Sequence, residues 1–276
     1  MSTLNYQISG NGTPVILIHG LFGNLDNLKT LANSLADHRV IRVDVPNHGL
    51  STHWQVMDYP SLAKAMTQLL DELSIDNAHF VGHSMGGKIA MAAALLYPQY
   101  VKSLVAADIA PVAYSPRHQL VFAALNQLDV KNLRSRSQGL AELLNSGIDE
   151  GTAQFLLKNL QKDDAGFSWK MNLAGLQACY DKLIGWDLSC DDLSSNDLSS
   201  NDLASNTIAT ELRYAGPSLC IRGGDSDYVK AEHSAQFVQQ FPAIQAKTLA
   251  GTGHWLHAQK PAIFNRLVGD FIASND

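Results

Sequence analysis

Gly82-His83-Ser84-Met85-Gly86 decides the fold, because it joins an apolar, strand-like segment (78–81) to an Ala-, Leu- and Met-rich helical segment (85–97). A serine with glycine two positions before it and two after it is typical of a sharp strand-to-helix turn. Neighbouring backbone comes close at both glycine positions, so neither residue can carry a side chain. The turn strains the serine backbone and directs its hydroxyl into a cleft. We therefore predict that Ser84 is a nucleophile.

A phosphate-binding loop is a second interpretation of this stretch, because Gly82 is followed five residues later by Gly87-Lys88. Ile89 stands where such loops have the Ser or Thr whose hydroxyl binds magnesium. We therefore expect no nucleotide here. The chemistry predicted for Ser84 requires neither a metal nor an organic cofactor.

Strands and helices alternate on either side of this turn. Further strands are predicted at 14–18, 39–45 and 102–107, and further helices at 24–36 and 59–73. Short apolar strands separated by amphipathic helices predict an α/β fold with a mostly parallel, doubly wound sheet that is covered on both faces.

The pattern changes in the second half of the chain. Residues 117–183 are predicted to be helical, with no strand among them. Strands and helices then alternate again at 217–221, 231–240, 245–249 and after Pro261. We predict a core domain at 1–111 and 212–276, and an inserted helical cap at 112–211 that roofs the carboxyl ends of the strands.

A low-complexity loop is predicted near 187–206. Three near-copies of one unit follow each other there, as Asp192-Leu-Ser-Ser-Asn196, Asp197-Leu-Ser-Ser-Asn201 and Asp202-Leu-Ala-Ser-Asn206. A period of five matches neither helix nor strand, and these residue types favour turns. A calcium site is the alternative, but the glycines and the closing glutamate of known calcium loops are missing.

The composition excludes several classes of function. The 276 residues carry 20 Lys and Arg against 26 Asp and Glu, which gives a net charge of −6 and a pI near 5.9. An acidic chain argues against nucleic acid as a partner. Three cysteines without CxxC spacing, no visible signal peptide and no membrane-spanning apolar run predict a cytoplasmic protein. The oligomeric state cannot be inferred from the sequence.

His19-Gly20-Leu21-Phe22-Gly23 follows the first apolar strand and is the second motif. The glycines leave the backbone free to turn its amides into the cleft. The amides of Leu21 and Met85 are predicted to form an oxyanion hole, with the Phe22 amide as the alternative to that of Leu21. The side chains of Phe22 and Met85 suggest an apolar acyl pocket.

A nucleophilic serine requires a general base. His254, in Gly251-Thr-Gly-His-Trp255, follows the last predicted strand and therefore reaches the sheet edge at which Ser84 lies. This position also fits the chain order of serine, acid and histidine. His257 is the alternative base.

The acid that orients the base has two candidate positions. Asp108 ends an apolar strand, where a carboxylate is expensive to bury without a partner. In most proteins with this kind of serine motif, the acid lies in a turn after the penultimate strand. In the corresponding turn at 223–227, Ser226 occupies the position of that acid. We predict Asp108 as the acid, with Ser226 in the same network, and Asp225 and Asp227 as the alternatives.

These motifs together resemble the α/β-hydrolase superfamily and, more narrowly, the bacterial YbfF-type esterases. The resemblance covers the chain apart from the repeat and is carried by His19-Gly-Leu-Phe-Gly23, Asn47-His-Gly-Leu-Ser51, Gly82-His-Ser-Met-Gly-Gly-Lys88, Asp108-Ile-Ala-Pro111 and Gly253-His-Trp-Leu-His257. It implies a carboxylesterase with a small helical cap that acts on acyl esters, with acyl-CoA thioesters as a second substrate class. It also implies the same roles for Ser84, His254, Asp108 and Ser226. The inserted repeat departs from the family pattern and leaves the substrate size open.

Two other functions stay open on the sequence alone. A lyase or C–C bond hydrolase of the same superfamily would use the same triad and would turn over simple esters poorly. A binding protein with a degenerate site is the second, although the intact Ser84, His254 and Asp108 argue against it.

Overall fold

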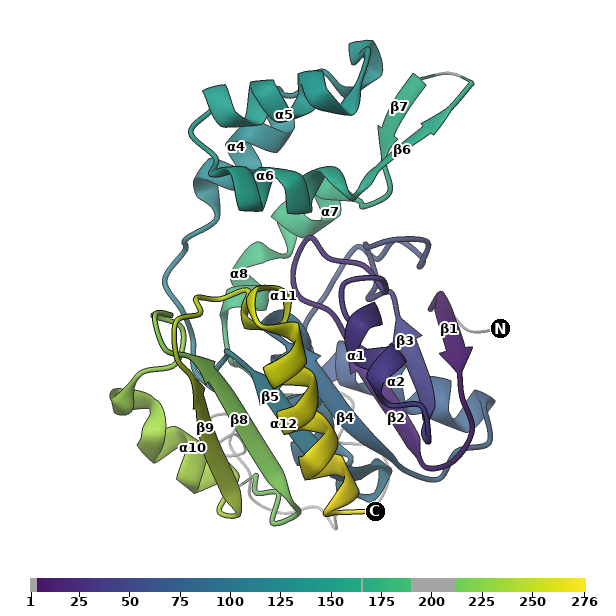
Figure 1. Cartoon of the computed structure of the whole chain (residues 1–276), viewed down its shortest axis with the longest axis vertical. Helices are drawn as coiled ribbons and strands as arrows, with labels where there is room; N and C mark the ends of the chain where they lie inside the picture. The colour runs from purple at the N-terminus through teal and green to yellow at the C-terminus, as the bar shows by residue number, and fades with distance from the viewer. Residues whose placement is uncertain (1–3, 165, 190–211) are drawn as a thin grey trace.

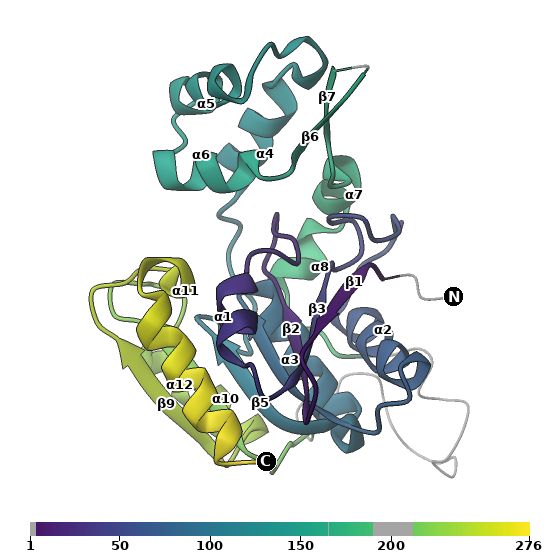
Figure 2. The same cartoon turned by 45° about the vertical axis from the view of Figure 1, so that its right-hand side comes forward.

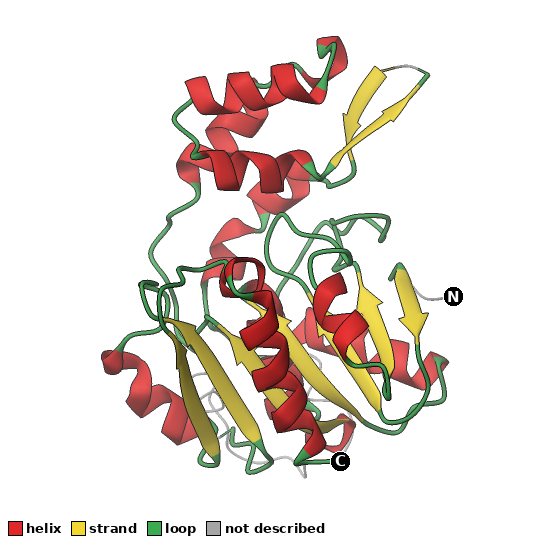
Figure 3. Ribbon diagram, in the orientation of Figure 1, coloured by secondary structure: helices red, strands yellow, loops and turns green. Residues whose placement is uncertain are grey.

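A seven-stranded sheet forms the centre of the computed structural model, which describes residues 4–164, 166–189 and 212–276 (Figure 3). The strand order is β1-β3-β2-β4-β5-β8-β9, and all neighbours are parallel except β1 and β3. The predicted α/β class with a mostly parallel sheet is confirmed. The strands are β1 (Tyr6–Ser9), β2 (Pro14–Ile18), β3 (Arg39–Val43), β4 (Ala78–His83), β5 (Val101–Ala107), β8 (Ser218–Gly223) and β9 (Ile244–Leu249).

Helices cover both faces of this sheet. Because side chains alternate along a strand, Val15 and Leu17 of β2 contact one layer, and Ile16 and Ile18 contact the other. The first layer contains α1 (Lys29–Ser34), α11 (Leu256–Gln259) and α12 (Pro261–Ala273), and the second contains α2 (Tyr59–Glu72), α3 (Met85–Leu96) and α10 (Ser234–Gln240) (Figure 1).

Two elements of the core differ from the sequence prediction. The antiparallel edge strand β1 is missing from that prediction, because most of its residues are exposed and it has no apolar run. Helix α1 begins at Lys29 rather than near residue 24. The Asn24 amide donates to the Asn27 side chain at 2.5 Å, and the Asp26 amide donates to the Asn24 side chain at 3.0 Å. Such local bonds compete with the helix.

Between β5 and residue 189, the described chain forms a cap layer above the carboxyl ends of the strands (Figures 1 and 2). It contains an antiparallel hairpin of β6 (Leu160–Asp163) and β7 (Gly166–Trp169), so the prediction of helices throughout 117–183 is wrong at this place. Four-residue strands are too short to leave a reliable period-two pattern in a sequence. The helices of this layer are α4 (Gln119–Gln127), α5 (Arg136–Asn145), α6 (Glu150–Leu157), α7 (Leu173–Ala178) and α8 (Tyr180–Ile184).

The limits of this layer at residues 112 and 211 stay a prediction, and the three five-residue repeats lie outside the described residues. Within the described ranges, no helix combines the length and the apolar character that crossing a membrane requires.

Candidate active site

Ser84 lies at the turn between β4 and α3 in a conformation that few non-glycine residues adopt, with φ 54° and ψ −123°. A Cβ atom on Gly82 would lie 2.0 Å from the carbonyl oxygen of Gly86, and a Cβ atom on Gly86 would lie 2.2 Å from that of Ile18. Both distances are far below van der Waals contact, so the turn requires glycine at both positions. The hydroxyl of Ser84 lines the two cavities between the sheet and the cap layer.

Three side chains at three strand ends form one hydrogen-bonded chain. His254 Nε2 lies 2.9 Å from Ser84 Oγ, and His254 Nδ1 lies 2.8 Å from Asp108 Oδ2. Asp108 directly follows β5, and His254 lies in the loop after β9. When Nδ1–H donates to the carboxylate, Nε2 is free to accept the serine proton. The structure therefore brings the three residues together in the order that the sequence predicts.

Asp108 is fully buried, and both of its oxygens accept hydrogen bonds. Oδ1 accepts from the Gly223 amide at 2.9 Å, while Oδ2 accepts from the Ser226 hydroxyl and from His254. These donors compensate for the removal of the carboxylate from water. Ser226 thus lies in the network in which the sequence places it.

The side-chain hydrogen bonds of His254 go to Asp108 and Ser84 and not to the alternative acids. The side chain of Asp225 is exposed. That of Asp227 is 68% exposed and pairs with Arg117 at 3.1 Å. The geometry therefore favours Asp108 over both of them.

The alternative base, His257, is buried against the rings of His83 and Phe264. Its ring centroid lies 4.3 Å from that of His83 and 6.1 Å from that of Phe264. Burial lowers the pKa of His257 to about 3, so its ring is neutral. His83 in turn donates from Nε2 to the carbonyl oxygen of His254 at 2.8 Å. These two histidines support the loop and do not contact the Ser84 hydroxyl.

Tyr228 is a member of the site that the sequence analysis does not identify. Its ring stacks on the imidazole of His254, with the centroids 3.6 Å apart and the planes 13° apart. The guanidinium of Arg117 lies 4.3 Å from the Tyr228 ring centroid. Stacking of this kind fixes the plane in which the imidazole meets its two partners. Nothing in the sequence distinguishes Tyr228 from an aromatic residue of the core.

Two buried histidines set the backbone of the loop after β2. The Phe22 amide donates to His48 Nε2 at 3.1 Å, and the Val45 amide donates to His19 Nε2 at 3.0 Å. Burial lowers the pKa of His19 to about 4 and that of His48 to about 3. Both rings are therefore neutral, which leaves their Nε2 atoms able to accept.

The predicted oxyanion amides lie beside Ser84. Because the Phe22 amide is engaged with His48, the Leu21 amide is the better candidate of the two. The Met85 amide belongs to the first turn of α3, where N–H groups have no acceptor within the helix. Leu21 and Met85 both line the smaller cavity at Ser84. A negative oxygen there would also meet the positive end of α3.

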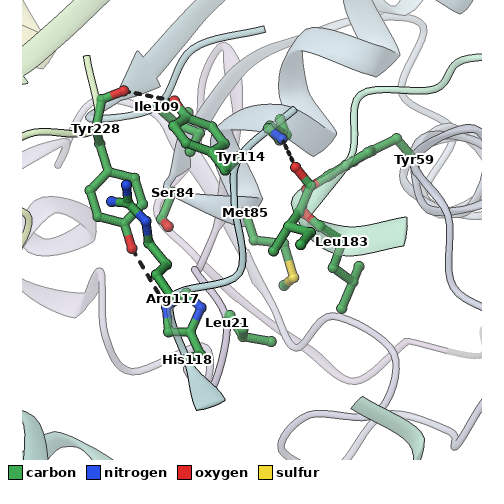
Figure 4. Close-up of a pocket in the computed structure, with 12 residues that line it drawn as sticks. Leu21, Tyr59, Ser84, Met85, Ile109, Tyr114, Arg117, His118, Leu183 and Tyr228 are labelled. Atoms are coloured by element: carbon green, nitrogen blue, oxygen red, sulfur yellow. Dashed lines mark hydrogen bonds between the residues drawn. The ribbon is translucent and has the colours of Figure 1, made fainter. Parts of the chain in front are cut away.

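Two cavities meet at Ser84 and share the lining residues Leu21, Ser84, Arg117, His118 and Tyr228. Figure 4 shows the residues that line the smaller one. The smaller cavity has a volume of about 30 Å³ and is also lined by Tyr59, Met85, Lys88, Ile109, Tyr114, Leu183 and Ile184. The larger cavity has a volume of about 220 Å³ and is also lined by Gly20, Phe22, His83, Val121, Thr152, Phe155, Leu156, His254 and Trp255. Phe22 therefore belongs to the larger cavity.

No candidate metal site accompanies these cavities. In the parts of the chain that the structure describes, no three His, Cys, Asp or Glu side chains converge to hold a metal ion.

The fold and the site match a known family. A family model described as the alpha/beta hydrolase fold matches residues 13–261. The chain belongs to the α/β-hydrolase family. Esterase YbfF of Escherichia coli is 38% identical over 96% of this chain and 95% of its own length, which confirms the resemblance to YbfF-type esterases. The sn-1-specific diacylglycerol lipase of Mus musculus is 33% identical over 98% of this chain and 85% of its own.

Among solved structures, a marine microorganism esterase superposes with a TM-score of 0.85 at 30% identity, covering 97% of this chain and 98% of that one.

The buried histidines predict a stability that falls with acid. Burial lowers the pKa of His19, His48 and His257 from 6.5 to between about 3 and about 4. Between pH 6.5 and 4 the unfolded chain therefore binds more protons than the folded chain. The free energy of unfolding falls as the pH decreases through this window.

Urea unfolding at pH 7 and pH 5 measures this effect, with His257→Phe as the comparison. Replacing one such histidine should reduce the loss of unfolding free energy between pH 7 and pH 5 by about 2 kcal/mol. An equal fall in the variant and the wild type would contradict the assignment of His257 as a buried neutral group.

Proposed function

We propose that this α/β hydrolase cleaves carboxylic esters through an acyl-enzyme on Ser84, with acyl thioesters as a second substrate class. The observation that carries the proposal is the hydrogen-bonded chain from Asp108 through His254 to Ser84, with distances of 2.8 and 2.9 Å. Acyl transfer requires a hydroxyl in contact with a base, and an acid that orients the base. Relatives that carry the names esterase and lipase support the same class of reaction.

The reaction begins when His254 Nε2 takes the proton of Ser84 and Oγ attacks the acyl carbonyl. The positive charge that develops on the imidazole is stabilised by the Asp108 carboxylate at Nδ1. Ser226 and the Gly223 amide hold that carboxylate in place. Tyr228 keeps the imidazole in the plane of its two partners.

The oxyanion that forms on the carbonyl is stabilised by the amides of Leu21 and Met85. His254 then returns the proton to the leaving alcohol or thiol, and the acyl group stays on Ser84. Water enters, His254 removes its proton, and the carboxylic acid leaves. These steps use only groups of this chain and water. The substrate is a small molecule, because cavities of about 30 and 220 Å³ flank the serine.

Hydrolysis of p-nitrophenyl esters and acyl-CoA thioesters of graded chain length tests the proposal. We expect turnover by the wild type, and a loss on the order of 10³-fold or more in Ser84→Ala and in His254→Ala, because each lacks half of the nucleophile–base pair. A folded wild-type protein that turns over none of these substrates would contradict the proposal. That result would favour the lyase or C–C bond hydrolase alternative.

The identity of the acid is tested separately by three matched substitutions. Asp108→Asn should lower kcat on the order of 10³-fold to 10⁴-fold, because an amide no longer selects the imidazole tautomer that accepts from serine. Asp225→Asn and Asp227→Asn should leave kcat close to the wild-type value. Full activity in Asp108→Asn together with loss in either of the other two would move the acid to the late turn.

A further inference from the structure

The side chain of Lys88 is buried in the core beside the active site. Its residue is 1% exposed, and it lies four positions after Ser84, one turn along α3. Its Nζ atom donates to the carbonyl oxygens of Ile184 at 3.0 Å and of Gly185 at 2.6 Å. These bonds tie the helix that starts at the nucleophile to the end of α8. None of the catalytic steps above uses this amine.

The carbonyl groups at the end of α8 explain why a donor is needed here. The last carbonyl groups of a helix have no N–H donor within the helix and must accept hydrogen bonds from elsewhere. Besides Lys88, the Tyr59 hydroxyl donates to the Leu183 oxygen at 2.5 Å, and the Tyr114 amide donates to the Ile184 oxygen at 2.9 Å. The end of α8 is thus held against α2 by the side chain of Tyr59 and against α3 by that of Lys88.

Aromatic rings surround the amine in place of a carboxylate. Nζ lies 5.4, 4.8 and 5.8 Å from the ring centroids of Tyr59, Tyr114 and Trp186. Within the described residues, no carboxylate lies at ion-pair distance from Lys88. The position of the amine therefore depends on the two carbonyl groups and the three rings.

An ester at Ser84 needs room for both an acyl group and a leaving group, and two cavities meet at this residue. The leaving group must lie next to His254, because His254 returns the proton to it. His254 lines the larger cavity and is absent from the lining of the smaller one. This arrangement favours the smaller cavity, which Met85 also lines, as the site of the acyl chain.

Two residues of α8, Leu183 and Ile184, line the smaller cavity. Figure 4 shows Tyr59 and Leu183 together at one side of Met85, and Arg117 and Tyr228 at the side of Ser84. Lys88 lines this cavity as well. The cavity volume of about 30 Å³ is far below the volume of about 220 Å³ of the larger cavity, so it favours the smaller part of a substrate.

We propose that Lys88 is the residue that limits the length of the acyl group, because its hydrogen bonds to Ile184 and Gly185 hold α8 across the end of the acyl pocket. The substrate class is esters of short acids, from acetyl to butyryl, with the bulk of the molecule in the leaving group. This inference rests on the proposed ester hydrolysis at Ser84. Lys88 acts here as a positioning residue.

Chain-length profiles test the proposal. The value of kcat/KM is measured with p-nitrophenyl acetate, butyrate, hexanoate and octanoate for the wild type, Lys88→Met and Lys88→Ala. The wild type should prefer acetate or butyrate. Each variant should raise the ratio of kcat/KM for hexanoate to that for acetate about tenfold or more, chiefly through KM. The reason is that the loss of the hydrogen bonds from Lys88 to Ile184 and Gly185 lets α8 move away from the acyl chain. Tyr59→Phe removes only the bond to Leu183, keeps the ring, and should shift the ratio in the same direction by less.

Phe155→Ala is the matched control in the larger cavity. It should change the preference for the leaving group and keep the acyl-chain profile of the wild type. A wild-type preference for octanoate would overturn the inference about Lys88, and so would an equal loss on all four esters in the Lys88 and Tyr59 variants. If the wild type shows no more turnover than Ser84→Ala, the proposed function itself is overturned. The two failures can therefore be distinguished.

Discussion

The burial of one carboxylate at the end of a central strand is the constraint on which the geometry of this site depends. Asp108 is withdrawn from water, and a charge at that depth is stable only when donors surround it. The donors come from the Gly223 amide, the Ser226 hydroxyl and the His254 ring. One buried charge therefore fixes the end of β8, the turn after it and the loop after β9. These are the segments that must meet for His254 to reach the nucleophile.

Backbone strain accompanies this arrangement at the neighbouring strand ends. Ser84 and Asp108 both adopt positive φ, at 54° and 51°. The Ser84 amide donates to the Ala107 oxygen at 2.9 Å, and the Asp108 amide donates to the Ile221 oxygen at 2.8 Å. The sheet hydrogen bonds thus continue through both strained residues. The rigid sheet, and not a flexible loop, sets the separation of nucleophile and acid, which is how a preorganised site avoids rearrangement during the reaction.

Much of this could be predicted from short-range chemistry. The glycines around Ser84 indicate a steric requirement, and a Cβ atom on Gly82 or Gly86 would indeed lie only 2.0 or 2.2 Å from a backbone oxygen. The position of Asp108 at the end of an apolar strand indicates that its carboxylate has a partner. Tyr228 could not be identified, because its contact with His254 depends on tertiary packing alone. The hairpin of β6 and β7 could not be identified either, because strands of four residues carry too little periodicity.

The same need to satisfy buried polar groups joins the cap layer to the core. Lys88 and Tyr59 provide donors to carbonyls at the end of α8, and the rings of Phe155 and Trp255 meet 4.2 Å apart on the other side of the site. The space left for a substrate is therefore defined by contacts between two layers that come from distant parts of the chain. Catalytic chemistry can be inferred from local motifs in such a fold, whereas substrate size requires the packed structure.

The most direct test of the account is to trap and locate the covalent intermediate. The protein is mixed with p-nitrophenyl acetate, quenched in acid during the first turnovers, and examined by intact mass and by peptide mapping. The account predicts one acetyl group per chain, on the peptide that contains Ser84. Turnover without any acetylated protein, or an acetyl group on Ser226 or Lys88 instead, would contradict it.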